Sequence, residues 1–219
     1  SFFYRTPLLI NGDTSFSTRF NFRIHSAGDG ADGMTFMLQG NSPTALGTDG
    51  SGLGYATIGR SLAIEIDNYQ GTGDPNGNHI GLLTNGSVTT HLQTYTPNFD
   101  LEDSVSHTLW VEYNGQTNQL TVYLAQATTT TRPATPVLTA TIDILSLLGG
   151  QAYIGFSAAT GGISNYHEVE TWTFDVNSLP PNTAPTLNAI PNQSNTVGDA
   201  VSLQISASDA DRDTLNYVA

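Results

Sequence analysis

The sequence predicts an all-β sandwich, and three observations support that prediction. Short runs of alternating apolar and polar residues recur along the chain and are rich in Phe, Tyr, Ile, Val, Thr and Trp. Gly, Asn, Asp and Pro separate these runs, as turns require. Helical periodicity is nearly absent. Strands that alternate in this way bury one face each, and two antiparallel sheets packed face to face would cover those faces.

The predicted strands follow in order at residues 15–25, 61–67, 107–113, 119–125, 152–158 and 169–176. Asn114-Gly115 lies in a polar turn between two of these runs, which predicts a β-hairpin. The segment "TIDILSLLGG" at 141–150 is the one helix-like stretch, and we expect a turn or a short helical loop there.

Composition argues against several classes of function. The 219 residues include 19 acidic and 6 basic ones, for a formal net charge of −13. Such a surface repels phosphate backbones and anionic membranes, so no nucleic-acid partner is expected. No apolar run is long enough for membrane insertion. There is no cysteine, which excludes disulfides and thiol catalysis.

Prolines divide the chain. Pro180, Pro181 and Pro185 disfavour a central strand, so residues 179–186 are predicted to link a sandwich domain at 1–178 to a second β domain at 187–219. The roughly 33 residues of that second part are too few for a stable core of their own. We therefore expect the second domain to be truncated, and the sequence to be a fragment.

The end of the chain carries its own resemblance. The segment "SDADRDTLNY" resembles the opening of bacterial immunoglobulin- or cadherin-like repeats. Asp209, Asp211 and Asp213 alternate there, so their side chains could face one calcium ion at a domain junction, although a polar turn would look the same.

The stretch "LAIEIDNYQGTGDPNGNHIGL" at 62–82 concentrates acidic groups in a chain with few charges. On a strand, Glu65 and Asp67 share one face, and the following loop can bring Asp74 and His79 to the same place. Carboxylates that converge without a cation raise one another's pKa, and a divalent metal removes that cost. Oxygen ligands favour calcium, and an imidazole favours manganese or another transition metal. The competing interpretation is a solvated acidic loop.

Catalysis is a further alternative, because two carboxylates on one strand face can cleave glycosidic bonds. The laminarinase-type β-glucanases carry Glu-x-Asp followed shortly by a second Glu. Here Asn68, Tyr69 and Gln70 follow Asp67, so the acid/base pair is incomplete and a β-glucan hydrolase is disfavoured.

Five segments in order resemble the legume-type (L-type) lectin domain: "SFSTRFNFRI", "ADGMTFML", the 62–82 stretch, "HTLWVEYNGQTNQLTVYL" and "AYIGFSAATGGISNYHEVETWTF". Together they cover nearly all of residues 2–176. The resemblance implies a concanavalin-like jelly-roll sandwich, paired manganese and calcium ions, and a sugar bound beside the calcium. It also implies a lectin and not an enzyme.

Carried over residue by residue, the resemblance gives ligands for both cations. Glu65, Asp67, Asp74 and His79 match the manganese ligands. Asp67 and Asp74 also bridge to calcium, and Tyr69 matches the residue whose backbone carbonyl binds calcium. In the family this aromatic ring also packs against the sugar.

The same resemblance gives a carbohydrate site. Asp32 matches the aspartate that accepts hydrogen bonds from sugar hydroxyls and follows a cis peptide bond. A glycine-rich loop that lends a backbone N–H and a specificity loop match Gly50, Gly52, Gly162 and Ile163.

One position departs from the family. Gly71 stands where an asparagine usually binds both calcium and sugar. Asn76 or Asn78 could replace that amide if the loop folds differently. Without it, sugar binding could be weak or lost.

Other residues receive structural interpretations. His91 and His107 are expected to be exposed, and His167 to make a structural hydrogen bond. Trp110 and Trp172 are expected in the core.

Together these features predict a metal-dependent carbohydrate-binding module, with glycans as partners. We expect it on a secreted or cell-surface, adhesin-like bacterial protein. The alternative is a structural or adhesive sandwich that keeps the metal site but binds no sugar.

Overall fold

The computed structural model describes residues 1–26, 28, 30–176, 185–190, 192, 194–200, 202–208 and 215. The chain divides into two compact units, Ser1–Leu179 and Pro180–Ala219. In the second unit, β13 (Thr186–Leu187) pairs with β14 (Ala207–Ser208). Asp209, Asp211 and Asp213 lie outside the described residues, so their predicted calcium site stays a prediction.

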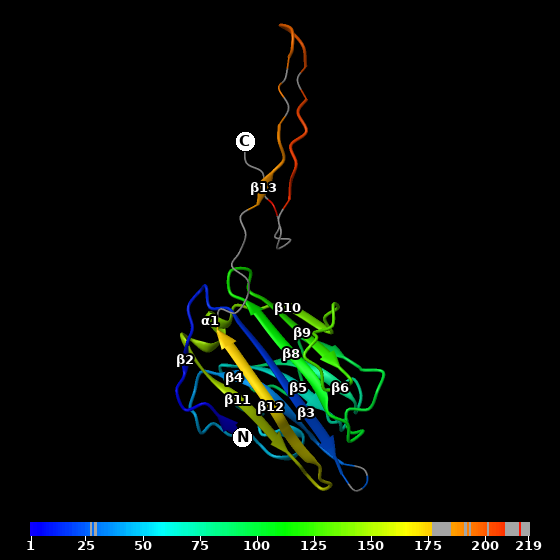
Figure 1. Cartoon of the computed structure of the whole chain (residues 1–219). Coiled ribbons are helices and arrows are strands. Elements are labelled where there is room, and N and C mark those ends of the chain that lie inside the picture. Colours follow the sequence, from blue (N-terminus) through cyan, green and yellow to red (C-terminus); the bar gives the residue numbers. More distant parts are fainter. Residues whose placement is uncertain are drawn as a thin grey trace. The chain divides into compact units, whose positions relative to one another are not determined.

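The first unit is a sandwich of antiparallel sheets (Figure 1). One sheet has seven strands in the order β1-β11-β4-β5-β6-β7, with β2 also paired to β11, and the other has five in the order β10-β9-β8-β3-β12. The all-β jelly-roll prediction is confirmed. The strands are β1 (Phe2–Phe3), β2 (Leu8–Leu9), β3 (Phe16–His25), β4 (Gly33–Gln39), β5 (Ser61–Asp67), β6 (His79–Thr84), β7 (Gln93–Tyr95), β8 (His107–Asn114), β9 (Gln119–Ala125), β10 (Leu138–Thr141), β11 (Gln151–Ala159) and β12 (Tyr166–Val176).

The main core lies between the two sheets. In β3, every second residue from Phe16 to Ile24 points inward and is buried, as the alternation predicts. The rings of Phe20 and Phe156 meet edge to face with centroids 4.9 Å apart. Trp172 from β12 packs on Phe156 at 5.0 Å, which agrees with its predicted core role. Each such ring contributes on the order of 1.5–3 kcal/mol through burial.

The hairpin and the helix form where the sequence places them. Asn114 pairs with Gln119 across the β8–β9 turn. The short helix α1 (Ile144–Leu148) begins after Asp143, whose side chain accepts a hydrogen bond from the Ser146 N–H. It ends at Gly149, which adopts the left-handed conformation that glycine tolerates best.

Strand β5 is buried on both faces, which simple alternation does not predict. Its inner residues, such as Ile64, join the main core. On the outer face, a second apolar cluster that includes Ala63, Leu53 and Tyr55 covers part of the sheet. This outer layer includes the 3-10 helix η1 (Gly50–Gly52) and the turns that follow it. The carboxylates on that face are therefore removed from water.

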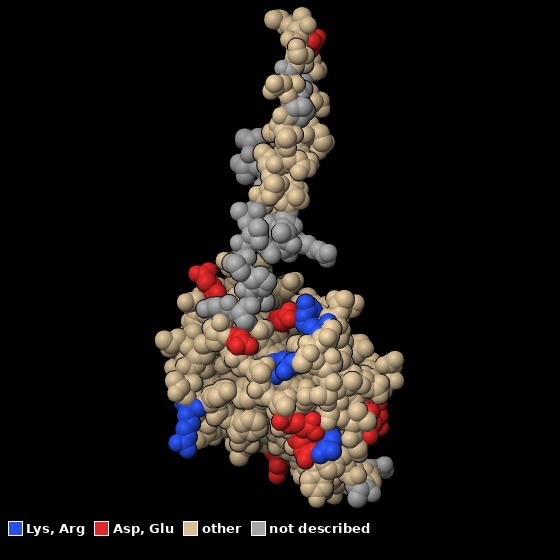
Figure 2. All heavy atoms as spheres, in the orientation of Figure 1, with Lys and Arg blue, Asp and Glu red and all other residues tan. Residues whose placement is uncertain are grey.

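Few charges mark the surface of this fold. The face turned to the viewer in Figure 2 is mostly neither acidic nor basic, with acidic and basic side chains scattered over it. No helix in the described part of the chain is both long and apolar enough to cross a membrane.

Candidate metal and carbohydrate site

Three neighbouring strands place the acidic residues. Asp67 pairs with His79 across β5 and β6, and Glu65 pairs with Gly81. On the other side of β5, Asp67 pairs with Gly33, the residue after Asp32. Gly33 has a φ of 148°, and a Cβ there would lie 2.5 Å from the Ile66 carbonyl oxygen, so only glycine allows this close pairing. The strand register thus brings Asp32, Asp67 and His79 to one end of the sheet.

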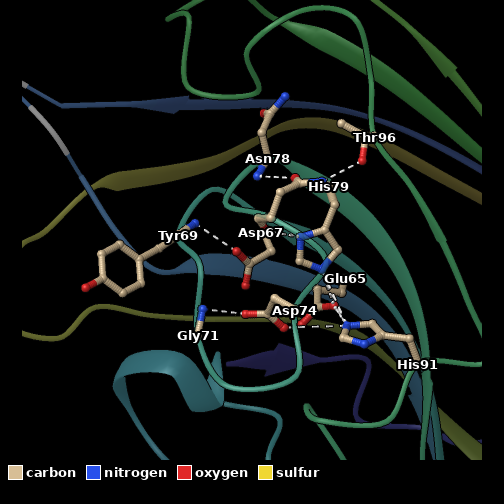
Figure 3. Close-up of polar contacts among 10 residues, drawn as sticks. Glu65, Asp67, Tyr69, Gly71, Asp74, Asn78, His79, His91 and Thr96 are labelled. Atoms are coloured by element: carbon tan, nitrogen blue, oxygen red, sulfur yellow. Dashed lines mark hydrogen bonds and ion pairs between the residues drawn. The ribbon is translucent and has the colours of Figure 1, made fainter.

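Four side chains form a compact group of potential metal ligands (Figure 3). Glu65, Asp74, His79 and His91 each offer one atom, and these atoms all lie within 4.8 Å of one another. The Oε2 atom of Glu65 is 3.2 Å from His79 Nε2 and 2.7 Å from His91 Nε2. Burial favours a neutral Glu65, but the hydrogen bonds to the two imidazoles outweigh it and lower the pKa of the carboxyl. Two nitrogens and two carboxylates are a donor set that fits a divalent transition metal.

Asp67 lies beside this group, and the residue is only 3% exposed. Its Oδ1 accepts a hydrogen bond of 2.8 Å from the Tyr69 backbone N–H. Burial and the nearby Glu65 charge raise the pKa of Asp67 to about 9. An acid in this environment gains from a cation that offsets the repulsion among the carboxylates. The residues present therefore fit the cation pair that the resemblance implies.

Three of the five predicted metal residues, Glu65, Asp74 and His79, belong to the compact group, and Asp67 is adjacent to it. Tyr69 follows Asp67 with its ring directed away from the carboxylates (Figure 3). The ligand roles of all five remain predictions.

His91 was missed by the sequence reasoning, and its expected exposure is wrong. Its side chain is only 7% exposed, and the hydrogen bond to Glu65 raises the pKa of its imidazole. No local pattern around His91 indicates this position, because the residue follows a turn and precedes the short strand β7. Only the path of the chain over the sheet brings it to Glu65.

Gly71 makes a backbone contact in place of the missing amide. Its N–H donates a hydrogen bond of 2.6 Å to Asp74 Oδ2. Asn76 and Asn78 do not replace the family asparagine, since both amides are bonded elsewhere. The Asn76 amide donates to Thr96 Oγ1 at 2.7 Å, and the Asn78 amide donates to the Phe99 carbonyl at 2.8 Å.

A cavity of about 350 Å³ adjoins the cation site. Asp32 lines it, after a cis peptide bond from Ala31. Burial raises the pKa of the Asp32 carboxyl, and a hydrogen bond from Ser51 opposes that shift. The buried Oδ2 atom of Asp32 has no hydrogen-bond partner among the described residues. The cavity is lined by Ala31, Asp32, Gly50, Ser51, Tyr69, Gly161, Gly162 and Ile163.

Five of the seven predicted carbohydrate-site residues line this cavity, and two do not. Gly52 and Gly71 instead line a neighbouring cavity of about 240 Å³, together with Asp74. Ser51 belongs to both cavities and was not predicted. The Ser51 hydroxyl lies 3.2 Å from Asp32 Oδ1. A Cβ added at Gly71 would lie 3.4 Å from the Cβ of Ser51. A serine between two glycines gave no signal in the sequence.

His107 and His167 both differ from what the sequence predicts. His107 was expected to face solvent but is fully buried, because its ring stacks on Phe99 and its Nε2 lies 3.0 Å from Asp103. His167 was expected to make a hydrogen bond, yet its buried Nε2 has no partner among the described residues. Burial lowers the pKa of His167 to about 4.

The His167 shift predicts acid sensitivity. The folded protein binds the proton on His167 only near pH 4, whereas the unfolded chain binds it near 6.5, so stability falls as the pH drops through this window. The loss between pH 7 and 4 is expected to be about 3 kcal/mol. Urea unfolding of wild type and His167→Gln at pH 7 and pH 4 measures the contribution of His167. Between these pH values, the free energy of unfolding should fall by about 3 kcal/mol less in the variant than in wild type. Equal losses in both proteins would contradict the low pKa of His167.

Comparison with known proteins identifies the fold family. A family model described as "Legume lectin domain" matches residues 1–189. The chain belongs to the legume lectin family. The L-type lectin-domain containing receptor kinase S.7 of Oryza sativa subsp. japonica is 36% identical over 179 residues, 76% of this chain and 25% of that protein. A seed lectin of Styphnolobium japonicum is 29% identical over 171 residues, 73% of this chain and 56% of that lectin.

Solved legume lectins share the architecture. The lectin from Bauhinia forficata, in complex with GalNAc, aligns with a TM-score of 0.69 and 26% identity, covering 81% of this chain and 79% of that one. Winged bean acidic lectin, complexed with methyl-α-D-galactose, aligns with a TM-score of 0.66 and 29% identity, covering 80% and 77%.

Membership in this family settles some predictions and not others. Legume lectins are non-catalytic carbohydrate-binding proteins, which confirms that the domain is not an enzyme and removes the hydrolase alternative. The chain spans about a quarter of the length of the receptor kinase from Oryza sativa. That relative and the seed lectin are plant proteins, so the predicted bacterial origin is not supported. The comparisons also give no support to an immunoglobulin- or cadherin-like repeat.

Proposed function

We propose that this lectin domain binds a carbohydrate in the cavity around Asp32 and that bound cations shape the site. The observation that carries the proposal is a buried carboxylate on the cavity wall, with one oxygen unpaired among the described residues. Sugar hydroxyls are the donors such an acceptor needs. A charge-assisted hydrogen bond to them is among the stronger polar contacts available in a protein site.

The remaining cavity wall suits a sugar ring. Tyr69 is 44% exposed, so one face of its ring is available for packing against the C–H face of a sugar. Gly50, Gly161 and Gly162 leave backbone groups accessible without side chains in the way. With these residues on its wall, the cavity suits an open, shallow carbohydrate site rather than a closed pocket.

The cations would bind residues behind the cavity wall and would not contact the sugar. Glu65, Asp67, Asp74 and His79 would hold a transition metal. Asp67 and Asp74 would also bind calcium, together with the Tyr69 carbonyl. Asp67 follows Ile66, whose carbonyl oxygen packs against Gly33, and Tyr69 lines the cavity. Holding this segment in place orients both Tyr69 and Asp32.

Gly71 favours a second candidate, a structural or adhesive sandwich that retains the cations but binds no sugar. The glycine supplies no side-chain amide, and Asn76 and Asn78 are bonded elsewhere. Against this candidate stands the Ser51 hydroxyl, which lies 3.2 Å from Asp32 and 3.5 Å from the Cβ position of Gly71. Ser51 thus offers a polar group close to where the amide is missing.

A glycan array with and without EDTA distinguishes the two. Galactose and GalNAc are the first probes, because lectins with similar structures are complexed with methyl-α-D-galactose and GalNAc. We expect binding with calcium and manganese present and its loss in EDTA. A folded protein that binds no glycan in the presence of both metals would favour the structural candidate.

We also propose a secreted or cell-surface setting for the whole protein. Its support is that curated relatives are named receptor kinases with L-type lectin domains.

A further inference from the structure

His91 occupies a position at the metal cluster that the resemblance to legume lectins did not predict. It comes from the connection between β6 and β7, whereas the predicted ligands come from β5, the following loop and the start of β6. Its Nε2 atom is 2.7 Å from Glu65 Oε2, 3.4 Å from His79 Nε2 and 3.8 Å from Asp74 Oδ1. The imidazole nitrogen therefore faces three potential ligands at once (Figure 3).

The absence of a side chain at Gly81 leaves room for the His91 imidazole. Gly81 lies opposite Glu65 on β6, and a Cβ there would be 2.4 Å from Glu65 Oε2 and 2.8 Å from His91 Cδ2. Any side chain at Gly81 would displace the carboxylate or the imidazole. The backbone beside His91 is fixed as well, because the Leu92 N–H donates to the Leu82 carbonyl at 2.8 Å.

The imidazole of His79 is oriented as in a histidine that binds a metal. His79 Nδ1 lies 3.0 Å from the Asn76 carbonyl oxygen, which leaves Nε2 directed to the cluster. Around a tetrahedral zinc ion, ligand atoms are about 3.3 Å apart. The separations from His79 Nε2 to Glu65 and to His91 are 3.2 and 3.4 Å. The separations from His91 Nε2 to Glu65 Oε2 and to Asp74 Oδ1 are 2.7 and 3.8 Å, so these side chains must shift to surround one ion evenly.

We propose that His91 is a direct ligand of the transition metal, together with Glu65, Asp74 and His79, and that this added imidazole increases the preference for zinc over manganese that such sites already have. Imidazole nitrogen suits zinc, whereas manganese prefers carboxylate, carbonyl and water oxygens. The inference rests on the proposed metal site and names the metal it selects.

Metal titration of the intact chain tests the proposal. Metal-free protein is titrated calorimetrically with zinc and with manganese, and each metal is counted by mass spectrometry after dialysis. Wild type should bind zinc more tightly than manganese. His91→Ala should weaken zinc binding by at least about tenfold and narrow the difference between the two metals. His25→Ala, which changes a histidine 29% exposed and outside the cluster, is the matched control and should bind both metals as wild type does.

X-ray absorption of the wild-type zinc complex gives a second readout that needs no variant. We expect the spectrum to show two imidazole ligands on the zinc. A spectrum that shows a single imidazole ligand would overturn the proposal. Wild-type zinc affinity in folded His91→Ala, or a preference of wild type for manganese, would also overturn it. These measurements do not involve sugar. Metal binding through one imidazole would therefore refute this inference alone, whereas no binding of any divalent metal would also refute the cation role in the proposed function.

Discussion

Replacing Asp32 by asparagine is expected to abolish measurable sugar binding while leaving the domain at least as stable as wild type. The binding loss follows from the charge, because a carboxylate that accepts hydrogen bonds from two hydroxyls contributes about 3 kcal/mol or more, which is at least about 100-fold in affinity. Asparagine keeps the volume but presents an NH₂ group to one of those donors. Calorimetry with the glycan selected on the array measures the change.

The stability effect has the opposite sign, and its cause is burial. Asp32 is 4% exposed, and its pKa is raised above the usual value because burial penalises the charged form. A group with a raised carboxyl pKa destabilises the fold at neutral pH, where it is ionised against that penalty. Asparagine removes the charge, so the unfolding midpoint should stay level or rise. A site that sacrifices stability for binding behaves in this way.

Asp13→Asn is the matched control, because it makes the same chemical change at an exposed turn residue. It should alter neither sugar binding nor stability. Wild-type sugar affinity in Asp32→Asn would show that the cavity at Asp32 is not the carbohydrate site. A folded Asp32→Asn that loses binding would separate the lectin from the purely structural sandwich.

The strands and much of the site could be predicted because their signals are local. Alternation located β3, β5, β8, β9, β11 and most of β12. It also placed Glu65 and Asp67 on the same face, since residues two apart on a strand must share one. The order of lectin-like segments then supplied Asp32, which the structure places on the cavity wall.

Burial on the outer face of β5 could not be predicted in the same way. Whether that face meets water depends on Leu53 and Tyr55, which lie in the turns before β5 and belong to no strand. The same reason explains His107, which is covered by Phe22 and Phe99 from other segments. Alternation identifies two faces of a strand, but only tertiary packing decides whether one or both are covered.

His91 and Ser51 were missed for a related reason. Each lies in or beside a turn, where polar residues are common and carry little information. Their roles come from contacts across the sheet, to Glu65 in one case and to Asp32 in the other. Gly81 was the one sequence feature tied to His91, but a single glycine in a strand has several explanations.

Glu65→Gln is expected to remove most of the stabilisation that metal gives to the fold. Glu65 is 1% exposed, and its Oε2 lies closest to both imidazole nitrogens, so it is the central ligand of the cluster. A metal present at about 1,000 times its dissociation constant stabilises the folded state by about 4 kcal/mol. In a domain of this size, that free energy raises the unfolding midpoint by about 10 °C. Thermal unfolding with and without zinc or manganese measures this increment.

The increment, rather than the midpoint itself, is the informative quantity. Glutamine also removes the pairing of Glu65 with His91 in metal-free protein, so the variant's starting midpoint can differ from wild type. Subtracting each protein's own metal-free midpoint cancels that difference. Glu112→Gln changes a glutamate paired with Arg132 at 2.9 Å, away from the cluster, and should keep the full increment. A full increment in Glu65→Gln would place the bound metal elsewhere, because glutamine lacks the charge that draws two imidazoles and a cation to one point.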